Sequence, residues 1–600
     1  MKKFTADFET CTWLPDETYV WAWAICDIDK PDDIKIGTDI NSFFELCKQY
    51  DNPKIMFHNL KFDGSFIISY LEEQNYTLIK DKSEAREHTY QTIISDLGAF
   101  YQIIVYEKTY KSKMKKITFI DSLKIINMSV KDIAKTFNLP ISKLEIDYNE
   151  FRERDHQLTE IEQDYIKNDV KIVALALKQL YDENLNKTTA AANALGYYKK
   201  ITGRQKFEHY FPELTYEEDA MIRPAYRGGF TYLNPVWKNV TAYTTYVLDV
   251  NSLYPSVMRY ELLPFAEPVY FEGKYKDNKL YPLYIQTIFC SFKVKKNKIP
   301  TIQIKEKNLF FASNEYIEDS GKEKFLLTLT NIDLELFLEH YDITSDIDYI
   351  DGFMFRGIKG LFDNYIDYWT ERKIQAGKEG NKGKRAIAKL QLNSLYGKFA
   401  KSTTIRSKYP FIGADGLIHF TMSEAKQENG IYIPVAAFIT SYARKKTIST
   451  SQAIKDYSIE HYGKDMYIYS DTDSIHTTLP IEECKKFCQI DDYKLRYWAH
   501  EATTYREKAI RQKCYIQEFY DEKVYKGKIK ISINKLHYKI TGIKRPYKTK
   551  ITCAGLPERC YDQVTWNNFQ EGFTAHGKLT YKYVKGGVKL VETDFTIKKG

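Results

Sequence analysis

The stretch Tyr469-Ser470-Asp471-Thr472-Asp473-Ser474 places two acidic residues one position apart between apolar, strand-like flanks. A hairpin with this sequence at its tip would turn both carboxylates to one face, where they repel each other unless a divalent cation lies between them. A polar β-turn explains the same residues, since Asp and Ser favour turns through local hydrogen bonds. A metal site at this hairpin therefore requires a third carboxylate from elsewhere in the chain.

A third carboxylate is offered by the strand-like run 246–250. Asp249 stands at the end of that run, and Ser252, Leu253 and Tyr254 then lead toward a helix. The free N–H groups at the start of a helix are suited to binding a triphosphate. We therefore expect this segment and the acidic hairpin to build one site for metal-assisted phosphoryl transfer.

A basic stripe is predicted between these two segments. In a helix, Arg385, Lys389 and Asn393 stand four residues apart on one face, with Tyr396 close to it. Such a stripe can bind the phosphates of a nucleotide, although a solvated helix face is the ordinary explanation for spaced Lys and Arg. Whether these residues bind phosphates or only face solvent depends on what the neighbouring segments bind.

Length and composition set wide limits on the class of protein. Six hundred residues exceed one core and predict several domains of about 150 residues each. The net charge of +8 arises from 88 basic and 80 acidic residues, which permits a polyanionic partner without a basic coat. The nine Cys residues form no paired metal-ligand pattern, and no apolar run reaches about 18 residues. We expect a soluble intracellular protein with free thiols and no membrane segment.

The first third of the chain offers a second group of acids. An alternating strand pattern puts Asp7 and Glu9 on one face. Asp63 follows an apolar run and is expected near the end of that strand. A helical pattern over the next acidic segment puts Tyr165 and Asp169, four residues apart, on one helix face. Alone, each residue fits an ordinary edge strand, loop or solvated helix.

Together and in this order, these residues resemble the three motifs of the proofreading 3′-5′ exonucleases of the acidic type that carries a Tyr. The resemblance implies that the four acids hold two metal ions and that Tyr165 orients the attacking water. Two cations can stabilise the entering and leaving oxygens of a phosphodiester. The resemblance also implies ligands for single-stranded DNA, which are His58, Asn59, Phe62, Ser122, Leu123, Lys143 and Tyr148.

The segment from Asp249 to Pro255 and the acidic hairpin resemble the first and last polymerase motifs of the family B DNA polymerases. The resemblance implies that Asp249, Val250 and Asp473 bind two Mg²⁺ or Mn²⁺ ions and that Asp471 supports the charge and geometry of the site. It also implies that Tyr254 disfavours a 2′-hydroxyl on the incoming nucleotide. The implied nucleotide ligands are Val250, Ser252, Leu253, Tyr254, Lys373, Arg385, Lys389, Asn393 and Tyr396.

Other segments match the DNA-binding motifs of the same family. The implied ligands of primer and template are Tyr226, Arg227, Gly228, Gly229, Thr440, Arg444, Lys513 and Tyr515. Two positions depart from the pattern, because Arg385 and Thr552 stand where relatives often carry Lys. Arg is a planar fork rather than a point charge, so the first change alters contact geometry.

A long segment between Pro255 and Trp369 is more than a polymerase palm requires. It narrows the resemblance to the protein-primed branch of family B, found in small tailed bacteriophages and some linear elements. That resemblance implies that the segment contacts a priming terminal protein, with Lys305 and Asp333 as candidate contacts. A second insertion, residues 400–433, is expected to close around downstream DNA and support strand displacement and processivity.

The expected fold class is α/β and α+β multidomain. An RNase H-like (DnaQ-like) exonuclease domain precedes a right-hand polymerase domain of palm, fingers and thumb with two insertions. The expected division is exonuclease 1–188, first part of the palm 189–260, first insertion 261–360, fingers 361–399, second insertion 400–433, second part of the palm 434–553 and thumb 554–600.

The sequence thus predicts a DNA polymerase that starts from a terminal protein, displaces the downstream strand and proofreads. The expected partners are primer-template DNA, deoxynucleoside triphosphates, the terminal protein and a single-stranded DNA-binding protein, and the chain is expected to be a monomer in the cytoplasm of an infected host. Two alternatives stay open, a family B polymerase that uses only nucleic-acid primers and a DNA-binding protein with a decayed catalytic core. Residues 520–550 receive no predicted role.

Overall fold

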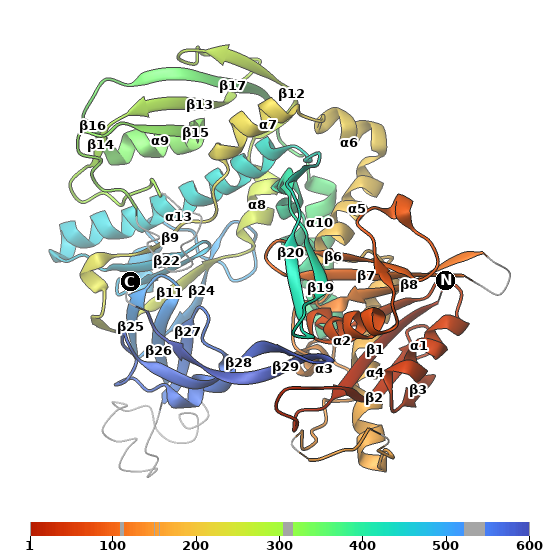
Figure 1. Ribbon diagram of the computed structural model, residues 1–600. Helices are drawn as coiled ribbons and strands as arrows, with labels where there is room; N and C mark the ends of the chain where they lie inside the picture. The colour runs from red at the N-terminus through yellow and green to blue at the C-terminus, as the bar shows by residue number, and fades with distance from the viewer. Residues whose placement is uncertain are drawn as a thin grey trace, which may run out of the picture. The chain divides into compact units, whose positions relative to one another are not determined.

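The computed structural model describes residues 2–108, 113–148, 150–154, 156–303, 316–520 and 547–598 (Figure 1). The chain forms two compact units. Unit 1 comprises residues 1–204, 364–429 and 580–591, and unit 2 comprises residues 205–363, 430–579 and 592–600. All nine Cys residues are buried free thiols, as predicted. The division into seven predicted segments stays a prediction.

Unit 1 is built on a mixed eight-stranded sheet with the order β3-β2-β1-β4-β8-β7-β6-β5. The central strands β1, β4 and β8 run parallel, and β2 pairs with β1 in the antiparallel sense. The strands are β1 Lys3–Thr10, β2 Val20–Asp27, β3 Ile34–Gly37, β4 Lys54–Phe57, β5 Thr77–Leu78, β6 Thr89–Ile94, β7 Phe100–Lys108 and β8 Met114–Asp121.

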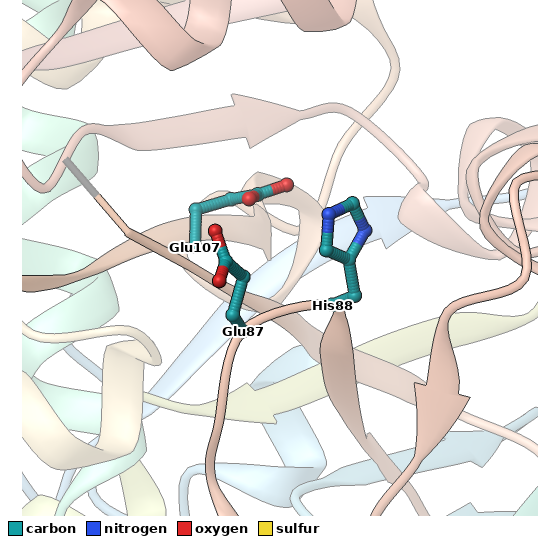
Figure 2. Close-up of side chains that lie close together, drawn as sticks. All are labelled: Glu87, His88 and Glu107. Carbon is teal, nitrogen blue, oxygen red and sulfur yellow. The ribbon is translucent and has the colours of Figure 1, made fainter. Parts of the chain in front are cut away.

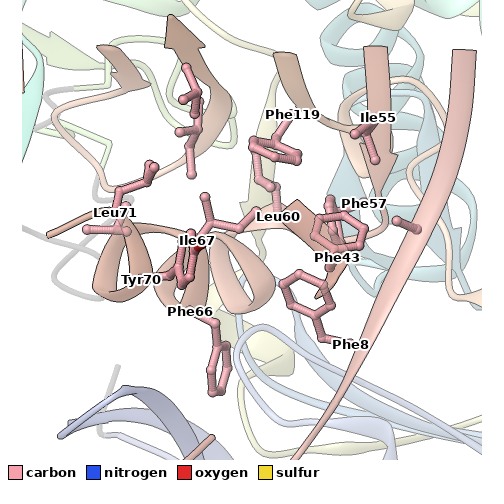
Figure 3. Packing of buried hydrophobic residues seen from close by; sticks show 14 of the residues in the cluster. Phe8, Phe43, Ile55, Phe57, Leu60, Phe66, Ile67, Tyr70, Leu71 and Phe119 are labelled. Atoms are coloured by element: carbon pink, nitrogen blue, oxygen red, sulfur yellow. The ribbon is translucent and has the colours of Figure 1, made fainter. Parts of the chain in front are cut away.

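The two faces of β1 are used differently. Phe8 and its apolar neighbours on β1 pack into a core with helices α1 (Ile40–Gln49) and α2 (Leu60–Glu73), where the rings of Phe43 and Phe57 lie beside Phe8 (Figure 3). The opposite face meets α4 (Glu160–Asp182), which begins at a capping box and follows the predicted helical pattern. The predicted alternation of β1 therefore separates its apolar residues from its acids.

Unit 1 also contains the helices predicted to carry the basic stripe. They are α10 (Asp363–Lys378) and α11 (Lys382–Ser394), followed by the short α12 (Tyr396–Phe399). Helix α11 packs against α5 (Ala190–Thr202). Beyond them, the region of the second predicted insertion forms two narrow ribbons, which pair β18 (Thr404–Ile405) with β21 (Lys426–Gln427) and β19 (Lys408–Ile412) with β20 (Ile418–Met422).

Unit 2 contains a five-stranded sheet with the order β24-β11-β23-β22-β9. The long helix α13 (Ile433–Tyr462) contacts β22 and β23 of this sheet and also the helices α8 (Leu253–Tyr260) and α9 (Asn331–His340). The strands are β9 Thr231–Leu233, β11 Tyr246–Val250, β22 Tyr467–Asp471, β23 Ser474–Thr477 and β24 Trp498–Thr503.

Two four-stranded sheets also belong to unit 2. One has the order β10-β25-β26-β27, and the other, within the first predicted insertion, has the order β12-β17-β13-β15. Their strands are β10 Thr241–Tyr243, β25 Arg506–Arg511, β26 Cys514–Tyr520, β27 Tyr547–Cys553, β12 Leu263–Glu272, β13 Leu283–Cys290, β15 Phe325–Thr330 and β17 Asp348–Ile358. Near the C-terminus, β28 (Thr574–Val584) and β29 (Gly587–Thr596) pair with each other.

Candidate active sites

The acids of unit 1 lie where strand β1 meets helix α4. Asp7 and Glu9 point from the polar face of β1, and α4 presents Tyr165 and Asp169 to that face. A hydrogen bond of 2.8 Å from Thr5 Oγ1 to the carbonyl of Val170 fixes the strand against the helix. The structure thus brings together four of the five residues that the exonuclease resemblance implies.

Asp63 completes this acidic cluster from a different element than predicted. It lies in the first turn of α2 rather than at a strand end, because Asn59 takes a left-handed conformation (φ 81°) and the helix begins one residue later. Its Oδ1 accepts a hydrogen bond of 3.3 Å from the N–H of Phe8. The neighbouring carboxylate of Asp7 raises the pKa of Asp63 further, after the larger effect of burial.

The cluster carries more negative charge than its protein partners balance. Burial and the nearby Asp169 raise the pKa of Asp7 to about 7, and burial with Asp7 and Asp169 raises the pKa of Glu9 well above its ordinary value. Lys143 Nζ lies 2.8 Å from Asp169 Oδ2. Asp169 Oδ1 is buried without a hydrogen-bond partner among the described residues. The donors therefore fit divalent cations, which prefer carboxylate oxygens.

Tyr165 stands at the edge of the cluster as a protonated phenol. Its hydroxyl lies 2.5 Å from the hydroxyl of Tyr148, a residue that is half exposed. Burial raises the pKa of Tyr165 well above its ordinary value, and the charges of Glu9 and Asp169 raise it further. A phenol held in this form can donate a hydrogen bond to a water or phosphate oxygen.

Several of the predicted single-strand ligands bind the protein itself. The imidazole of His58 lies 3.0 Å from Ser122 Oγ and 2.8 Å from the carbonyl of Met128. Ser122 is fully buried, so the prediction of a direct DNA contact does not fit its position. Asn59 is engaged by the hydroxyl of Tyr581 at 2.9 Å, and the ring of Phe62 packs half-buried beside Phe66.

Asp121 organises this loop and was missed by the sequence analysis. Its Oδ1 accepts hydrogen bonds of 3.1 Å from the N–H of Asn59 and 3.0 Å from the N–H of Leu123. One buried carboxylate thereby fixes both segments that carry predicted DNA ligands. Its place directly before Ser122 and Leu123, at the end of an apolar strand, was the available sequence signal.

The residues of the basic stripe are exposed. Arg385, Lys389 and Asn393 all lie on the solvent-facing side of α11. Lys373 comes from α10, and burial followed by the charges of Arg385 and Lys389 lowers its pKa. Three cations that repel one another in this way form a surface that a polyphosphate would stabilise.

The acidic hairpin of unit 2 has the predicted form. Strands β22 and β23 pair with Asp471 opposite Ser474, and Thr472 takes a left-handed conformation (φ 60°) in the turn. Strand β11 pairs with the other edge of β23, with Asp249 opposite Ser474, and the N–H of Val250 donates to the carbonyl of Asp473 at 2.8 Å. The third carboxylate therefore lies beside the hairpin tip, as the sequence predicts.

The two acids of the hairpin are unequal. Asp471 lies 2.8 Å from Lys513 Nζ and accepts a hydrogen bond of 3.2 Å from the hydroxyl of Tyr469. Asp473 has no ion pair among the described residues, and burial, then Asp471 and Glu501, raise its pKa. Asp471 is thus already neutralised, whereas Asp473 keeps an unbalanced charge beside Asp249.

Glu501 is a second residue that the sequence analysis missed. It occupies a bulge of β24, where Val247 of β11 pairs with Ala502 and Leu248 pairs with His500. A bulge turns its extra side chain in a direction that strict alternation does not give. The register of β24 against β11 is invisible in the sequence, so alternation alone could not place this acid near Asp473.

The glycine loop lies directly against the hairpin turn. A Cβ on Gly229 would come within 2.5 Å of Thr472 Oγ1, so the close approach requires glycine. From the other side, the guanidinium of Arg444 donates to the carbonyls of Arg227 and Gly228 at 2.7 and 2.8 Å. The loop is therefore fixed between helix α13 and the acidic hairpin.

Three predicted contacts need correction in this region. Arg444 and Asp333 form a buried ion pair, with Nε 3.1 Å from Oδ1, so neither faces DNA or a partner protein directly. Thr440 is also buried, and its hydroxyl donates within α13 to the carbonyls of Ala436 and Ala437. Lys305, the other predicted terminal-protein contact, lies outside the described residues, as does most of the segment 520–550.

The remaining residues of unit 2 that are predicted to bind DNA or the nucleotide come from the β25–β26 hairpin, the glycine loop and helix α8. Lys513 is exposed beside Asp471, and the ring of Tyr515 lies 5.4 Å from that of Tyr469. Tyr226 and Arg227 are half-buried in the glycine loop. On α8, Leu253 is buried, while Ser252 caps the helix in a left-handed conformation and Tyr254 follows in its first turn.

Among the described residues, every helix is too short or too polar to cross a membrane. Comparison with known proteins gives a consistent result over the whole chain. The family described as DNA polymerase type B, organellar and viral, matches residues 45–492. The DNA polymerase of Bacillus phage M2 is 43% identical over 599 residues, and the match covers 100% of this chain and 100% of the relative. The DNA polymerase of Bacillus phage phi29 is 41% identical over 602 residues, and the match covers 100% of this chain and 99% of the relative.

Solved structures of the phi29 enzyme extend the likeness to the fold. An orthorhombic crystal form superposes with a TM-score of 0.89, and a complex with primer-template DNA and incoming nucleotide superposes with 0.88. Both are 38% identical and cover 100% of each chain. This full-length match confirms the predicted multidomain fold class and the resemblance to polymerases of small bacteriophages. The chain therefore belongs to the organellar and viral type B DNA polymerases, and it is a DNA-directed DNA polymerase.

Proposed function

We propose that this polymerase replicates a linear viral genome by protein-primed, strand-displacing and processive synthesis, and that it proofreads with a 3′-5′ exonuclease. The observation that carries the synthetic activity is Asp249 opposite Ser474, which sets it beside Asp473 at the hairpin tip. Support for the substrates comes from the phi29 enzyme, whose structure contains primer-template DNA and incoming nucleotide. The proposed partners are these two, a terminal protein and a single-stranded DNA-binding protein.

In synthesis, Asp249, Asp473 and the backbone of Val250 would hold two Mg²⁺ or Mn²⁺ ions. Such ions neutralise the triphosphate and stabilise the developing charge as the primer 3′-hydroxyl attacks the α-phosphate and pyrophosphate leaves. Asp471 is bound by Lys513, so we assign it the task of orienting the hairpin. Tyr254 lies in the first turn of α8, where we propose that its ring packs under the sugar.

The basic stripe would bind the triphosphate of the incoming nucleotide. Burial lowers the pKa of Lys373, and the nearby charges of Arg385 and Lys389 lower it further, so the three cations repel one another. An anion with several negative charges relieves that repulsion and receives hydrogen bonds from the Arg fork. Asn393 and Tyr396 would complete this set.

In proofreading, Asp7, Glu9, Asp63 and Asp169 would hold two divalent cations, consistent with the raised pKa values of Asp7, Glu9 and Asp63 and with the unpartnered oxygen of Asp169. The protonated hydroxyl of Tyr165 would orient the attacking water. Lys143 Nζ lies 2.8 Å from Asp169 Oδ2 and would also donate a hydrogen bond to a phosphate oxygen. Hydrolysis then releases one nucleotide from the 3′ end.

Protein priming would use the region 261–360, which forms its own sheet and the helix α9. Asp333 is buried in this region, and its ion pair with Arg444 connects helix α9 to helix α13. Any contact with a terminal protein would therefore come from other residues, of which Lys305 remains a candidate. The ribbons of residues 404–427 are the proposed strand-displacement element.

The decisive experiment supplies the terminal protein of the same genetic element, one radioactive deoxynucleoside triphosphate and a divalent cation. We expect a covalently labelled terminal protein with the natural chain and none with the matched variant Asp473→Ala. Extension of an oligonucleotide primer without labelling would favour a polymerase that uses only nucleic-acid primers. Absence of both activities would favour a DNA-binding protein with a decayed core.

A further inference from the structure

A second group of metal-ligating side chains lies in unit 1 at the far edge of the sheet. Glu87, His88 and Glu107 each offer a ligand atom, and the three atoms lie within 4.8 Å of one another. Figure 2 shows the carboxylate of Glu107 between the carboxylate of Glu87 and the imidazole of His88. None of these residues belongs to the acidic cluster on β1 and α4.

The fold explains why two neighbouring residues face the same partner. Thr89 of β6 pairs with Tyr106 of β7, so the next pair outward along the ribbon is His88 with Glu107. Successive residues of a regular strand point to opposite faces. His88 instead takes a left-handed conformation (φ 57°), which lets Glu87 and His88 both approach Glu107.

Glu107 is the residue that points to a ligand. Its side chain is only 6% exposed, and it accepts a hydrogen bond from the hydroxyl of Tyr76. Among the described residues no Lys or Arg pairs with it, and the ammonium of Lys115, opposite it on β8, turns to the carbonyl of Lys48. A buried carboxylate without a counter-charge is costly, and a bound cation would remove that cost.

The other two donors are open to solvent. Glu87 and His88 are both exposed, and the ring of His88 rests 4.8 Å from that of Tyr76. Glu87 Oε2 also lies 3.0 Å from Lys108 Nζ, in a pair that is nearly half exposed. Exposed pairs of this kind contribute little to stability, so Lys108 can be displaced by a stronger cation.

We propose that Glu87, His88 and Glu107 bind one divalent transition-metal ion, with Zn²⁺ as the best match. One imidazole nitrogen and two carboxylate oxygens suit Zn²⁺, and the exposed side leaves room for a water as fourth ligand. Mg²⁺ prefers sites made only of oxygen ligands and binds such a set weakly. The ion would join the segment before β6 to the end of β7 and fix the outer ribbon of the sheet, apart from either reaction.

The acidic clusters of the chain could also bind zinc, so the test must report on His88 itself. Diethyl pyrocarbonate modifies free imidazoles, and peptide mass spectrometry measures the rate at each His of the full chain. With Zn²⁺ at about ten times its dissociation constant, we expect His88 to react about tenfold more slowly. His576, which pairs with Asp594 at 2.7 Å but has no third ligand, is the matched internal control and should change little.

Two variants localise the effect. In Glu87→Gln, whose side chain is exposed, and in Glu107→Gln, zinc should no longer protect His88. Circular dichroism checks that each variant is folded, and Glu87→Gln decides the question should Glu107→Gln unfold. Equal reactivity of His88 with and without Zn²⁺, protection that survives in Glu87→Gln, or equal protection by Mg²⁺ would overturn the proposal.

Discussion

The two acidic sites of this polymerase differ in how their negative charge is balanced. In unit 1, four carboxylates share one ammonium, Lys143, and one oxygen of Asp169 has no described partner. In unit 2, the ammonium of Lys513 pairs with Asp471, and Asp473 has no ion pair among the described residues. In the absence of cations, the carboxylates of unit 1 therefore repel one another more strongly than those of unit 2.

The two acidic sites are also held by different surroundings. The cluster of unit 1 takes its acids from a strand and two helices over an aromatic core. The hairpin of unit 2 is backed by a polar network, in which Arg444 and Asp333 position the glycine loop. The consequences of single substitutions should therefore differ between the two sites.

Removing the acids should separate the two activities, which is the largest effect we expect. Asp473→Ala should lower primer extension by at least about 10³-fold, equivalent to about 4 kcal/mol, and leave degradation of single-stranded DNA. Asp7→Ala with Glu9→Ala should do the reverse. Primer extension and 3′-end degradation on labelled oligonucleotides measure both. Normal extension by Asp473→Ala would reject the hairpin site.

Breaking the buried ion pair behind the hairpin should cost stability. Asp333→Ala leaves the guanidinium of Arg444 buried without its carboxylate, and we expect a loss of about 3 kcal/mol in the free energy of unfolding. Glu335→Ala is the matched control, because it removes an exposed pair with Lys445 between the same two helices and should cost less than about 1 kcal/mol. Denaturant unfolding measures both, and equal losses would argue against a buried network.

Exchanging each lysine for methionine compares the charge balance of the two sites directly. Lys143→Met removes the ammonium beside Asp169, so we expect exonuclease activity to fall by about 10- to 30-fold, or 1.4 to 2 kcal/mol. Lys513→Met frees Asp471, which is not a proposed ligand, and should reduce primer extension only a few-fold. Steady-state rates on matched substrates check the order, and a larger loss in Lys513→Met would reverse the comparison.

Much of both sites could be predicted from the sequence because their residues follow local rules. Alternation placed Asp7 and Glu9 on one face, and spacing of four placed Tyr165 with Asp169. The hairpin and the strand of Asp249 followed from the same periodicity. Family resemblance added the order of the motifs, and the full-length match to phage polymerases confirms the family.

The errors concern contacts between distant segments and irregular backbone conformations. Arg444 and Asp333 are charged residues that look exposed in the sequence, yet they pair across 111 positions inside unit 2. Glu501 depends on a bulge, and Asp63 depends on a left-handed residue that starts its helix early. Burial, bulges and cross-segment pairs are decided by tertiary packing, which a single sequence does not display.

The last expected effect is a dependence of stability on pH in the absence of metal ions. The pKa of Asp7 is raised from 3.8 to about 7 in the folded chain, so folding takes up a proton between these values. The stabilising contribution of the neutral carboxyl is complete at acidic pH and is lost as the pH rises through about 7. In a chelating buffer, the melting temperature of the natural chain should therefore fall across this window.

The variant Asp7→Asn removes the titrating group, so its melting temperature should fall less steeply with pH. Added Mg²⁺ should raise the melting temperature of the natural chain at alkaline pH, because cations balance the same charge. Parallel melting curves for both proteins would mean that the acids of unit 1 are balanced without metal, and the contrast with the hairpin would then disappear.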